Sequence, residues 1–188
     1  AEGTIMYPNE PVVTVVAPLI DAQLVETAIL AEFNHQSLIA TKTRRIRKAA
    51  GKRVVSDFGA RRAHNMDAAV YGARAAYIGG ADGTATVLAG KMFGIPVGGT
   101  MAHSWVMYYQ DEAFKKYAKN YPDETVLLID TYDVVKSGVP NAIRVAKEVL
   151  EPIGKRLKGV RIDSGDLAYL SKKVRKMLDD AGLNDCKI

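Results

Sequence analysis

A histidine between small residues, in the segment GTMAHSW at residues 99–105, could perform chemistry. His103 is one of three histidines in the chain. Ser104 is expected to cap the helix that follows, and the backbone N–H groups at a helix start can bind a phosphate or a phosphorylated side chain. Asp133 could accept the second imidazole N–H and orient the ring. A loop histidine is more often a structural hydrogen-bonding residue, so on this motif alone both interpretations stay open.

Acidic residues follow two later apolar runs, in LLIDTYD at residues 127–133 and GVRIDSGD at residues 159–166. Asp163 could hold ribose hydroxyls, or an Mg²⁺ ion that carries a pyrophosphate, and Arg161 could neutralise an anionic substrate. Asp166 is expected to cap the next helix. No His-Glu or Cys-Cys spacing indicates a zinc site, and no G-x-S-x-G motif indicates a serine hydrolase.

The segment DFGARRAH at residues 57–64 combines two arginines with an aromatic ring. Arg61 and Arg62 could bind a carboxylate or phosphate while Phe58 stacks on a planar ring, which suits a planar anion. The first three residues match the magnesium triplet of protein kinases, but no glycine-rich loop or catalytic-loop motif accompanies them. The alternative is a solvated arginine pair beside a core phenylalanine.

Short apolar runs, each followed by a turn and an amphipathic helix, predict repeated βα units. Strands are expected at residues 12–19, 54–57, 95–97, 126–130 and 159–163, with a further strand starting in the last three residues. Helices are expected at residues 21–50, 65–78, 84–93, 104–119, 139–150 and 166–180. Asp21 is placed to cap the first helix, and Gly51 to end it.

The unusual residues all follow the predicted strands rather than precede them. In parallel α/β folds the ligand lies at that end, because the βα loops converge there. The sequence therefore predicts one common mouth that is lined by the motifs at residues 57–64, 98–104, 129–133 and 161–166. The four strands expected from residue 54 onward, or five with the one that starts in the last three residues, do not close an eight-stranded barrel, so the sheet is either open or part of something larger.

The composition predicts a folded chain in a reducing, cytoplasmic compartment. The 188 residues are 48% hydrophobic and contain one cysteine, which excludes an internal disulfide. Neither a secretory signal nor a run of membrane-spanning length is visible, so we expect no membrane association. The net charge of +5 is spread along the chain except for one basic cluster at residues 42–53. These cations could offset the helix dipole or bind a phosphate-rich small ligand, whereas nucleic acid is disfavoured because aromatic residues are not interleaved.

Six segments together resemble the nicotinate phosphoribosyltransferase family in order and spacing: YPNEP, LIATKTRRIR, DFGARRAH, GTMAHSW, LLIDTYD and GVRIDSGDL. The resemblance covers essentially all 188 residues. It implies an α/β fold: an incomplete, irregular β/α barrel of the type II phosphoribosyltransferase kind, with a piece of a small β-rich domain at the N-terminus. Residues 1–20 would belong to the small domain and residues 21–188 to about half of the barrel. The family's chain is longer at both ends, so we expect a fragment whose 5-phosphate site lies beyond residue 188.

The resemblance also implies an activity in NAD salvage: nicotinate and phosphoribosyl pyrophosphate give nicotinate mononucleotide and pyrophosphate, with coupled ATP hydrolysis. His103 matches the histidine that ATP phosphorylates, and Asp133 matches its partner. Mg²⁺ and ATP are expected, with no tightly bound organic cofactor, no side chain assigned as a metal ligand, no nucleic acid partner, and a homodimer as the assembly. The expected substrate-binding residues are Phe58, Arg61, Ala85, Ser104, Asp130, Arg161 and Asp163.

Individual roles follow from the same resemblance. Phe58 and Arg61 match positions that stack on and neighbour the pyridine ring, and Arg161 and Asp163 match positions around the pyridine and ribose. Related nicotinamide-using enzymes have an aspartate that contacts the amide where this chain has Ala85, which suits a carboxylate substrate. The alternatives are a nicotinamide or quinolinate phosphoribosyltransferase, or a non-catalytic fragment that only binds a ligand or a partner subunit.

Overall fold

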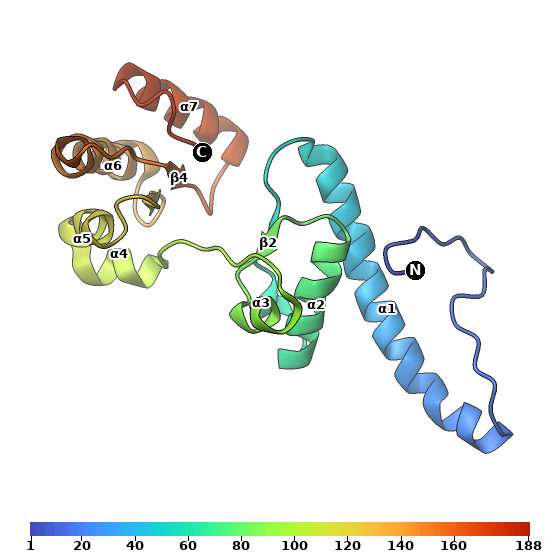
Figure 1. The fold of residues 1–188 in the computed structure, drawn as a ribbon. Coiled ribbons are helices and arrows are strands. Elements are labelled where there is room, and N and C mark those ends of the chain that lie inside the picture. The colour runs from blue at the N-terminus through green and yellow to red at the C-terminus, as the bar shows by residue number, and fades with distance from the viewer. The chain divides into compact units, whose positions relative to one another are not determined.

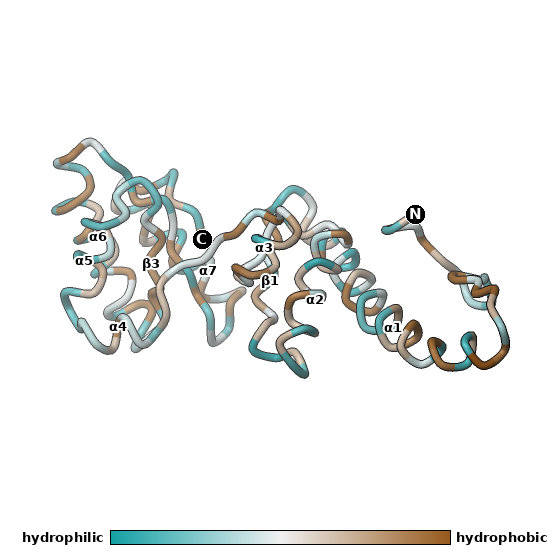
Figure 2. Tube along the Cα trace, turned by 60° about the horizontal axis from the view of Figure 1, so that its bottom comes forward, coloured by the Kyte–Doolittle hydropathy of each residue, from teal (hydrophilic) through white to brown (hydrophobic).

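The computed structural model describes residues 1–188, and their contacts divide them into two units, residues 1–99 and 100–188. Each unit has its own apolar core. Each also has its own helices and a short parallel pair of strands (Figure 1). None of the helices combines the length and the apolar character that crossing a lipid bilayer requires. The longest, α1 (Leu19–Ala50), alternates hydrophilic and hydrophobic residues along its length (Figure 2).

The first unit packs α1 against a small βα core. Its further elements are β1 (Ser56–Asp57), the 3-10 turn η1 (Ala60–Arg62), α2 (Met66–Ile78), β2 (Gly83–Thr84) and α3 (Val87–Phe93). β1 and β2 are parallel, and Val97 adds a single parallel bridge to Thr84. The second half of α1 approaches α2 closely because Gly72 of α2 has no side chain at the contact. A Cβ on Gly72 would lie 3.1 Å from the Ile39 Cδ1 atom.

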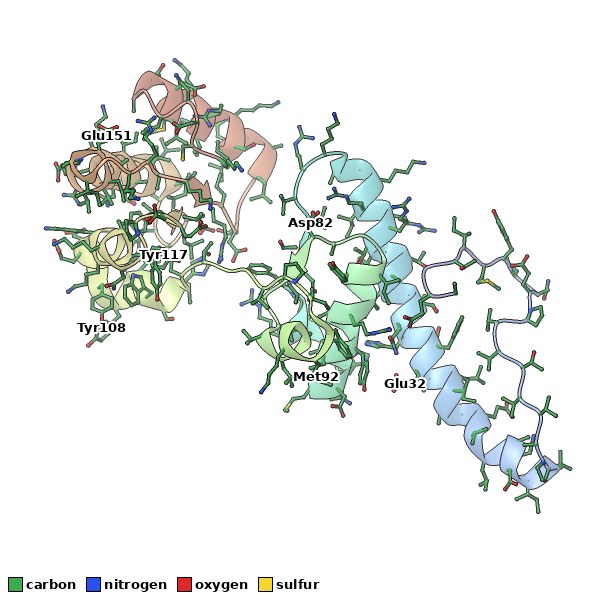
Figure 3. All side chains as sticks on the ribbon, in the orientation of Figure 1. Glu32, Asp82, Met92, Tyr108, Tyr117 and Glu151 are labelled. Atoms are coloured by element: carbon green, nitrogen blue, oxygen red, sulfur yellow. The ribbon has the colours of Figure 1, made fainter.

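The two ends of α1 are stabilised in different ways. The N-cap residue is Pro18, which makes no side-chain cap, so the cap predicted at Asp21 is wrong. Asp21 lies in the first turn, where its charge still interacts favourably with the helix dipole. Gly51 ends the helix with a φ of 60°, as predicted. In the basic cluster, Arg47 donates to Asp82 at 2.8 Å, so part of that cluster is structural. Figure 3 labels Asp82, which lies in the segment between α2 and β2.

Residues 11–18 form no strand, so the strand predicted at residues 12–19 is wrong. The predicted strand rested on the valine-rich composition of this segment. A strand forms only where a neighbouring strand pairs with its backbone N–H and C=O groups. No strand of the structure pairs with this segment.

The second unit surrounds a parallel pair of strands with helices. Its elements are α4 (His103–Tyr109), the 3-10 turn η2 (Gln110–Glu112), α5 (Ala113–Asn120), β3 (Val126–Leu128), the π-helical η3 (Val134–Gly138), α6 (Val139–Val145), the π-helical η4 (Ala146–Leu150), the 3-10 turn η5 (Glu151–Ile153), β4 (Gly159–Arg161) and α7 (Leu167–Asp180). β3 pairs with β4, and Lys187 adds a single parallel bridge to Gly159 on the other side, so the strand expected in the last three residues is reduced to this bridge. Leu127, Leu128 and Ile129 are fully buried in the core.

Several predicted elements are present with different bounds. The strand predicted at residues 95–97 is reduced to the bridge at Val97, and β2 was not predicted. The helix predicted at residues 104–119 is interrupted because Gln110, with a φ of 50°, turns the chain. The helix predicted at residues 139–150 starts earlier, at Val134, through a π-helical turn. The helix starts predicted at residues 65 and 166 are confirmed, and a side chain caps each of them. Asn65 accepts from the Ala68 N–H, and Asp166 accepts from the Tyr169 N–H.

Gly138 is the residue at which η3 touches the end of the β3 strand, and it gives a test of the packing. A Cβ on Gly138 would lie 1.9 Å from the Ile129 carbonyl oxygen, so the backbone must move to admit any side chain. We expect Gly138→Ala to lower the free energy of unfolding by about 1–3 kcal/mol in urea denaturation. Gly99→Ala is the control, because a Cβ there has no heavy atom within 4 Å. Equal stability of the two variants would contradict the close approach.

Candidate functional site

His103 and Asp130 form a hydrogen-bonded pair in the second unit. His103 is the first residue of α4, and its Nε2 lies 3.2 Å from Asp130 Oδ1. The Asp130 side chain is 1% exposed and the His103 side chain 38%. A carboxylate only accepts hydrogen bonds, so Nε2 carries the proton and, in the neutral ring, the lone pair is on Nδ1. The ring is thus anchored on a buried anion, with part of it exposed to solvent.

Asp130 links the loops that follow β3 and β4. Its Oδ2 accepts from the Asp163 backbone N–H at 3.0 Å and from the Ser164 hydroxyl at 2.6 Å. Burial raises the pKa of Asp130, but the hydrogen bonds from Ser164 and Asp163 and the neighbouring His103 outweigh it, and the pKa is lower than usual. Asp130 is therefore ionised at neutral pH. One buried carboxylate joins α4, the β3 loop and the β4 loop.

Arg161 and Asp163 lie at the end of β4, next to the residues that Asp130 joins. Arg161 is the last residue of β4, and its guanidinium donates to the Thr100 hydroxyl. Arg161 Nη2 lies 3.7 Å from Asp163 Oδ2, and the Asp163 side chain is 43% exposed. A cation and an accessible carboxylate thus lie beside the buried Asp130. This arrangement can bind an anion and a polyhydroxyl group together.

Asp133 and Ser104 do not have the roles that the sequence predicted for them. Asp133 accepts from the backbone N–H groups of Val135 and Lys136 at 2.9 and 2.7 Å, so it caps η3. Its pKa is lowered, chiefly by the Lys136 N–H. The predicted contact between His103 and Asp133 is therefore wrong in its partner, which is Asp130. Ser104 is exposed in the first turn of α4 and makes no cap, because Ala102 is the N-cap residue.

Three further predicted residues lie together in the first unit. Phe58 follows β1 and is 48% exposed, and the exposed Arg61 belongs to η1. Ala85 follows β2, and its backbone N–H donates to the Asp57 carbonyl at 2.9 Å. Since Asp57 and Thr84 are paired in the parallel register, the Phe58 turn and Ala85 leave the sheet at the same end.

Residues that the sequence did not single out support both groups. Thr100 and Ser164 bind Arg161 and Asp130 through their hydroxyls, and Asp57 and Thr84 join the two strands of the first unit. Asp57, Thr84 and Ser164 each stand next to a predicted site residue, and Thr100 lies within the motif at residues 99–105, so position in the sequence was the available signal. The structure has no group of three or more histidine, cysteine, aspartate or glutamate side chains that could hold a metal ion.

Comparisons with known proteins agree on one family. The model of the nicotinate phosphoribosyltransferase (NAPRTase) family matches residues 54–186. Nicotinate phosphoribosyltransferase of Bacillus subtilis is 58% identical over 100% of this chain and 38% of its own length. The structure of human nicotinic acid phosphoribosyltransferase matches with a TM-score of 0.87 and 31% identity, over 96% of this chain and 46% of that one.

A second solved structure shares the fold. Nicotinate-nucleotide pyrophosphorylase from Pyrococcus furiosus matches with a TM-score of 0.66 and 32% identity, over 81% of this chain and 39% of that chain. Both neighbours support the mixed helix and sheet fold of the type II phosphoribosyltransferases that the sequence predicted. The chain spans 38% of the length of the Bacillus subtilis relative, so its residues account for only part of such an enzyme.

Proposed function

The chain belongs to the nicotinate phosphoribosyltransferase family, and from this premise we propose that it forms part of an enzyme of NAD salvage. The reaction joins nicotinate to phosphoribosyl pyrophosphate and gives nicotinate mononucleotide and pyrophosphate. ATP hydrolysis is coupled to it through a phosphohistidine. The observation that carries this proposal is the His103–Asp130 pair, which Ser164 and Asp163 hold at the ends of two parallel strands.

His103 is the proposed acceptor of the γ-phosphoryl group of ATP. The Nδ1 lone pair attacks phosphorus, the N–P bond forms and the bond to the ADP oxygen breaks. Nε2 keeps its proton, and the phosphorylated ring becomes cationic. Asp130, already ionised and 3.2 Å from Nε2, stabilises that charge without having to reorganise.

Arg161 and Asp163 are proposed to act on the sugar and its leaving group. Displacement of pyrophosphate builds positive charge at the anomeric carbon and negative charge on the leaving oxygens, so the site needs both signs of charge. The exposed Asp163 fits an Mg²⁺ ion that arrives with the pyrophosphate, because Mg²⁺ commonly uses one or two carboxylates and the substrate's phosphates. When bound, that ion would neutralise the departing pyrophosphate. Arg161 would bind the anionic substrate.

Phe58, Arg61 and Ala85 are proposed to form the pyridine subsite. The exposed ring of Phe58 can stack on the pyridine, and Arg61 can pair with the nicotinate carboxylate. Ala85 is small and uncharged, so it admits a carboxylate where an aspartate would repel it. This neutral position is the feature that favours nicotinate over nicotinamide.

The substitution Ala85→Asp tests the specificity. It places a carboxylate near the nicotinate carboxylate, and we expect the KM for nicotinate to rise at least about tenfold. The control Ala85→Ser adds a smaller polar group without charge and should change this KM much less. Steady-state kinetics of the complete gene product at saturating phosphoribosyl pyrophosphate measures both. An unchanged KM in Ala85→Asp would remove the argument from charge.

The remaining architecture is part of the same proposal. Residues 21–188 would form about half of an irregular β/α barrel, and residues 1–20 would belong to a small β-rich domain. The complete protein would be a cytoplasmic homodimer, with the 5-phosphate site outside residues 1–188.

One assay tests the function directly. The complete gene product is given nicotinate and phosphoribosyl pyrophosphate, with and without ATP, and nicotinate mononucleotide is measured. Formation of the product, faster with ATP, is the expected result. Turnover of nicotinamide or quinolinate in place of nicotinate would support a related transferase. Binding of nicotinate without any product would support a non-catalytic role.

A further inference from the structure

We propose that Asp57 and Thr84 are positioning residues that set the geometry of the pyridine subsite. The inference rests on the proposed function, since it concerns the nicotinate that Phe58, Arg61 and Ala85 would bind. Neither Asp57 nor Thr84 needs to touch the substrate. They act by fixing the turn after β1 relative to the residue after β2.

The Asp57 carboxylate binds both segments at once. Its Oδ1 accepts from the Gly59 N–H at 3.0 Å, which holds the turn that carries Phe58 and leads to Arg61. Its Oδ2 accepts from the Thr84 hydroxyl at 2.8 Å. Hydrogen bonds to a charged acceptor are stronger than those between neutral groups, so this carboxylate is a firm link between two loops.

The Thr84 hydroxyl extends the link to the other side of Ala85. While it donates to Asp57, it accepts from the Thr86 N–H at 2.9 Å. The Thr84 backbone is held as well, because its N–H donates to the Pro96 carbonyl at 3.0 Å. Ala85 thus lies between two residues whose positions are fixed, and its own N–H is bound to the Asp57 carbonyl.

Thr84 acts through its neighbours rather than on a ligand. The residue is 1% exposed, so its hydroxyl has no access to a substrate. Both of its hydrogen bonds join backbone segments that carry residues of the proposed subsite. A shift of one segment against the other changes the distance between the Phe58 ring and Ala85, and small displacements of that kind weaken binding strongly.

The test compares three variants of the complete gene product. Thr84→Val keeps the volume and removes the hydroxyl, and Thr84→Ser keeps the hydroxyl. Thr86→Val is the matched control, because the Thr86 hydroxyl is buried and has no hydrogen-bond partner. Each variant is assayed for the KM and kcat with nicotinate, for nicotinate binding by calorimetry, and for labelling of the protein by γ-labelled ATP.

We expect Thr84→Val to raise the KM and the dissociation constant for nicotinate about tenfold, with ATP labelling unchanged. Thr84→Ser and Thr86→Val should bind nicotinate within about twofold of the wild type. Wild-type affinity in Thr84→Val would overturn the inference. Equal losses in Thr84→Val and Thr84→Ser would also overturn it, because packing and not the hydroxyl would then be responsible.

The same measurements remain decisive if Thr84→Val does not fold or if the proposed function fails. Should Thr84→Val fail to fold, Asp57→Asn replaces it, and unchanged nicotinate affinity in Asp57→Asn overturns the inference. Should the wild type bind nicotinate without forming product, the proposed function fails, and calorimetry on the variants still decides the roles of Asp57 and Thr84.

Discussion

The substitution His103→Asn should abolish incorporation of labelled phosphate from γ-labelled ATP while the fold is retained. The asparagine amide can still donate to Asp130, but it lacks a nucleophilic ring nitrogen. The expected label falls to background, which is the largest effect predicted for any single substitution. Phosphohistidine is labile in acid and stable in alkali, so treatment of the labelled protein identifies the bond. Circular dichroism verifies that the variant is folded.

The other two histidines are matched controls for this experiment, since the chain contains three. His64 is exposed, and His35 Nε2 lies 3.1 Å from the Ala68 carbonyl in the helix contact of the first unit. His64→Asn and His35→Asn should both keep the label. Retained labelling in His103→Asn would show that a different residue accepts the phosphoryl group.

The substitution Asp130→Ala should reduce both stability and phosphorylation. It leaves His103, the Ser164 hydroxyl and the Asp163 N–H without their shared acceptor. Loss of a buried, hydrogen-bonded charge typically costs about 3 kcal/mol in the free energy of unfolding. We expect the labelling rate to fall at least about 100-fold as well, because the ring loses its orientation and the anion that stabilises the phosphorylated state. Urea denaturation and rapid-quench labelling measure the two effects.

The substitution Asp130→Asn removes the charge of this residue and keeps its volume. The pH dependence of the free energy of unfolding then reports on the charge. The pKa of Asp130 is lower in the folded protein than in the unfolded chain. Its carboxylate therefore stabilises the fold above the unfolded pKa of about 4, and this stabilisation is lost as the pH falls through the folded value. The stability difference between the wild type and Asp130→Asn should shrink at acid pH. A difference that stays constant or grows below about pH 4 would contradict the assignment.

His64→Asn serves again as a reference for the pH series. Its side chain is exposed in the other unit, so its effect on stability should be small at every pH. A common loss of stability in all variants at low pH reflects the other carboxylates. Only the part that distinguishes Asp130→Asn from the wild type reports on Asp130.

The sequence by itself determined where chemistry-bearing residues stand along the chain. Apolar runs followed by polar turns indicated parallel strands, and these runs placed His103, Asp130 and Asp163 at loops that the structure joins through Asp130. The helix starts at Asn65 and Asp166, each capped by its side chain, were also predicted, because a cap acts over only three residues. The family followed from the same motifs.

Only the tertiary structure decided which residues contact one another. Asp130 and Asp133 both follow β3, and both could have faced His103 on sequence grounds. The π-helical turn that begins at Val134 takes Asp133 as its cap and leaves Asp130 for the histidine. The hydrogen bond between the Asp57 and Thr84 side chains joins residues 27 positions apart, and β2 is a strand through its backbone pairing with β1. Local patterns describe the preferences of a segment, whereas a contact between distant segments depends on the packing that brings them together.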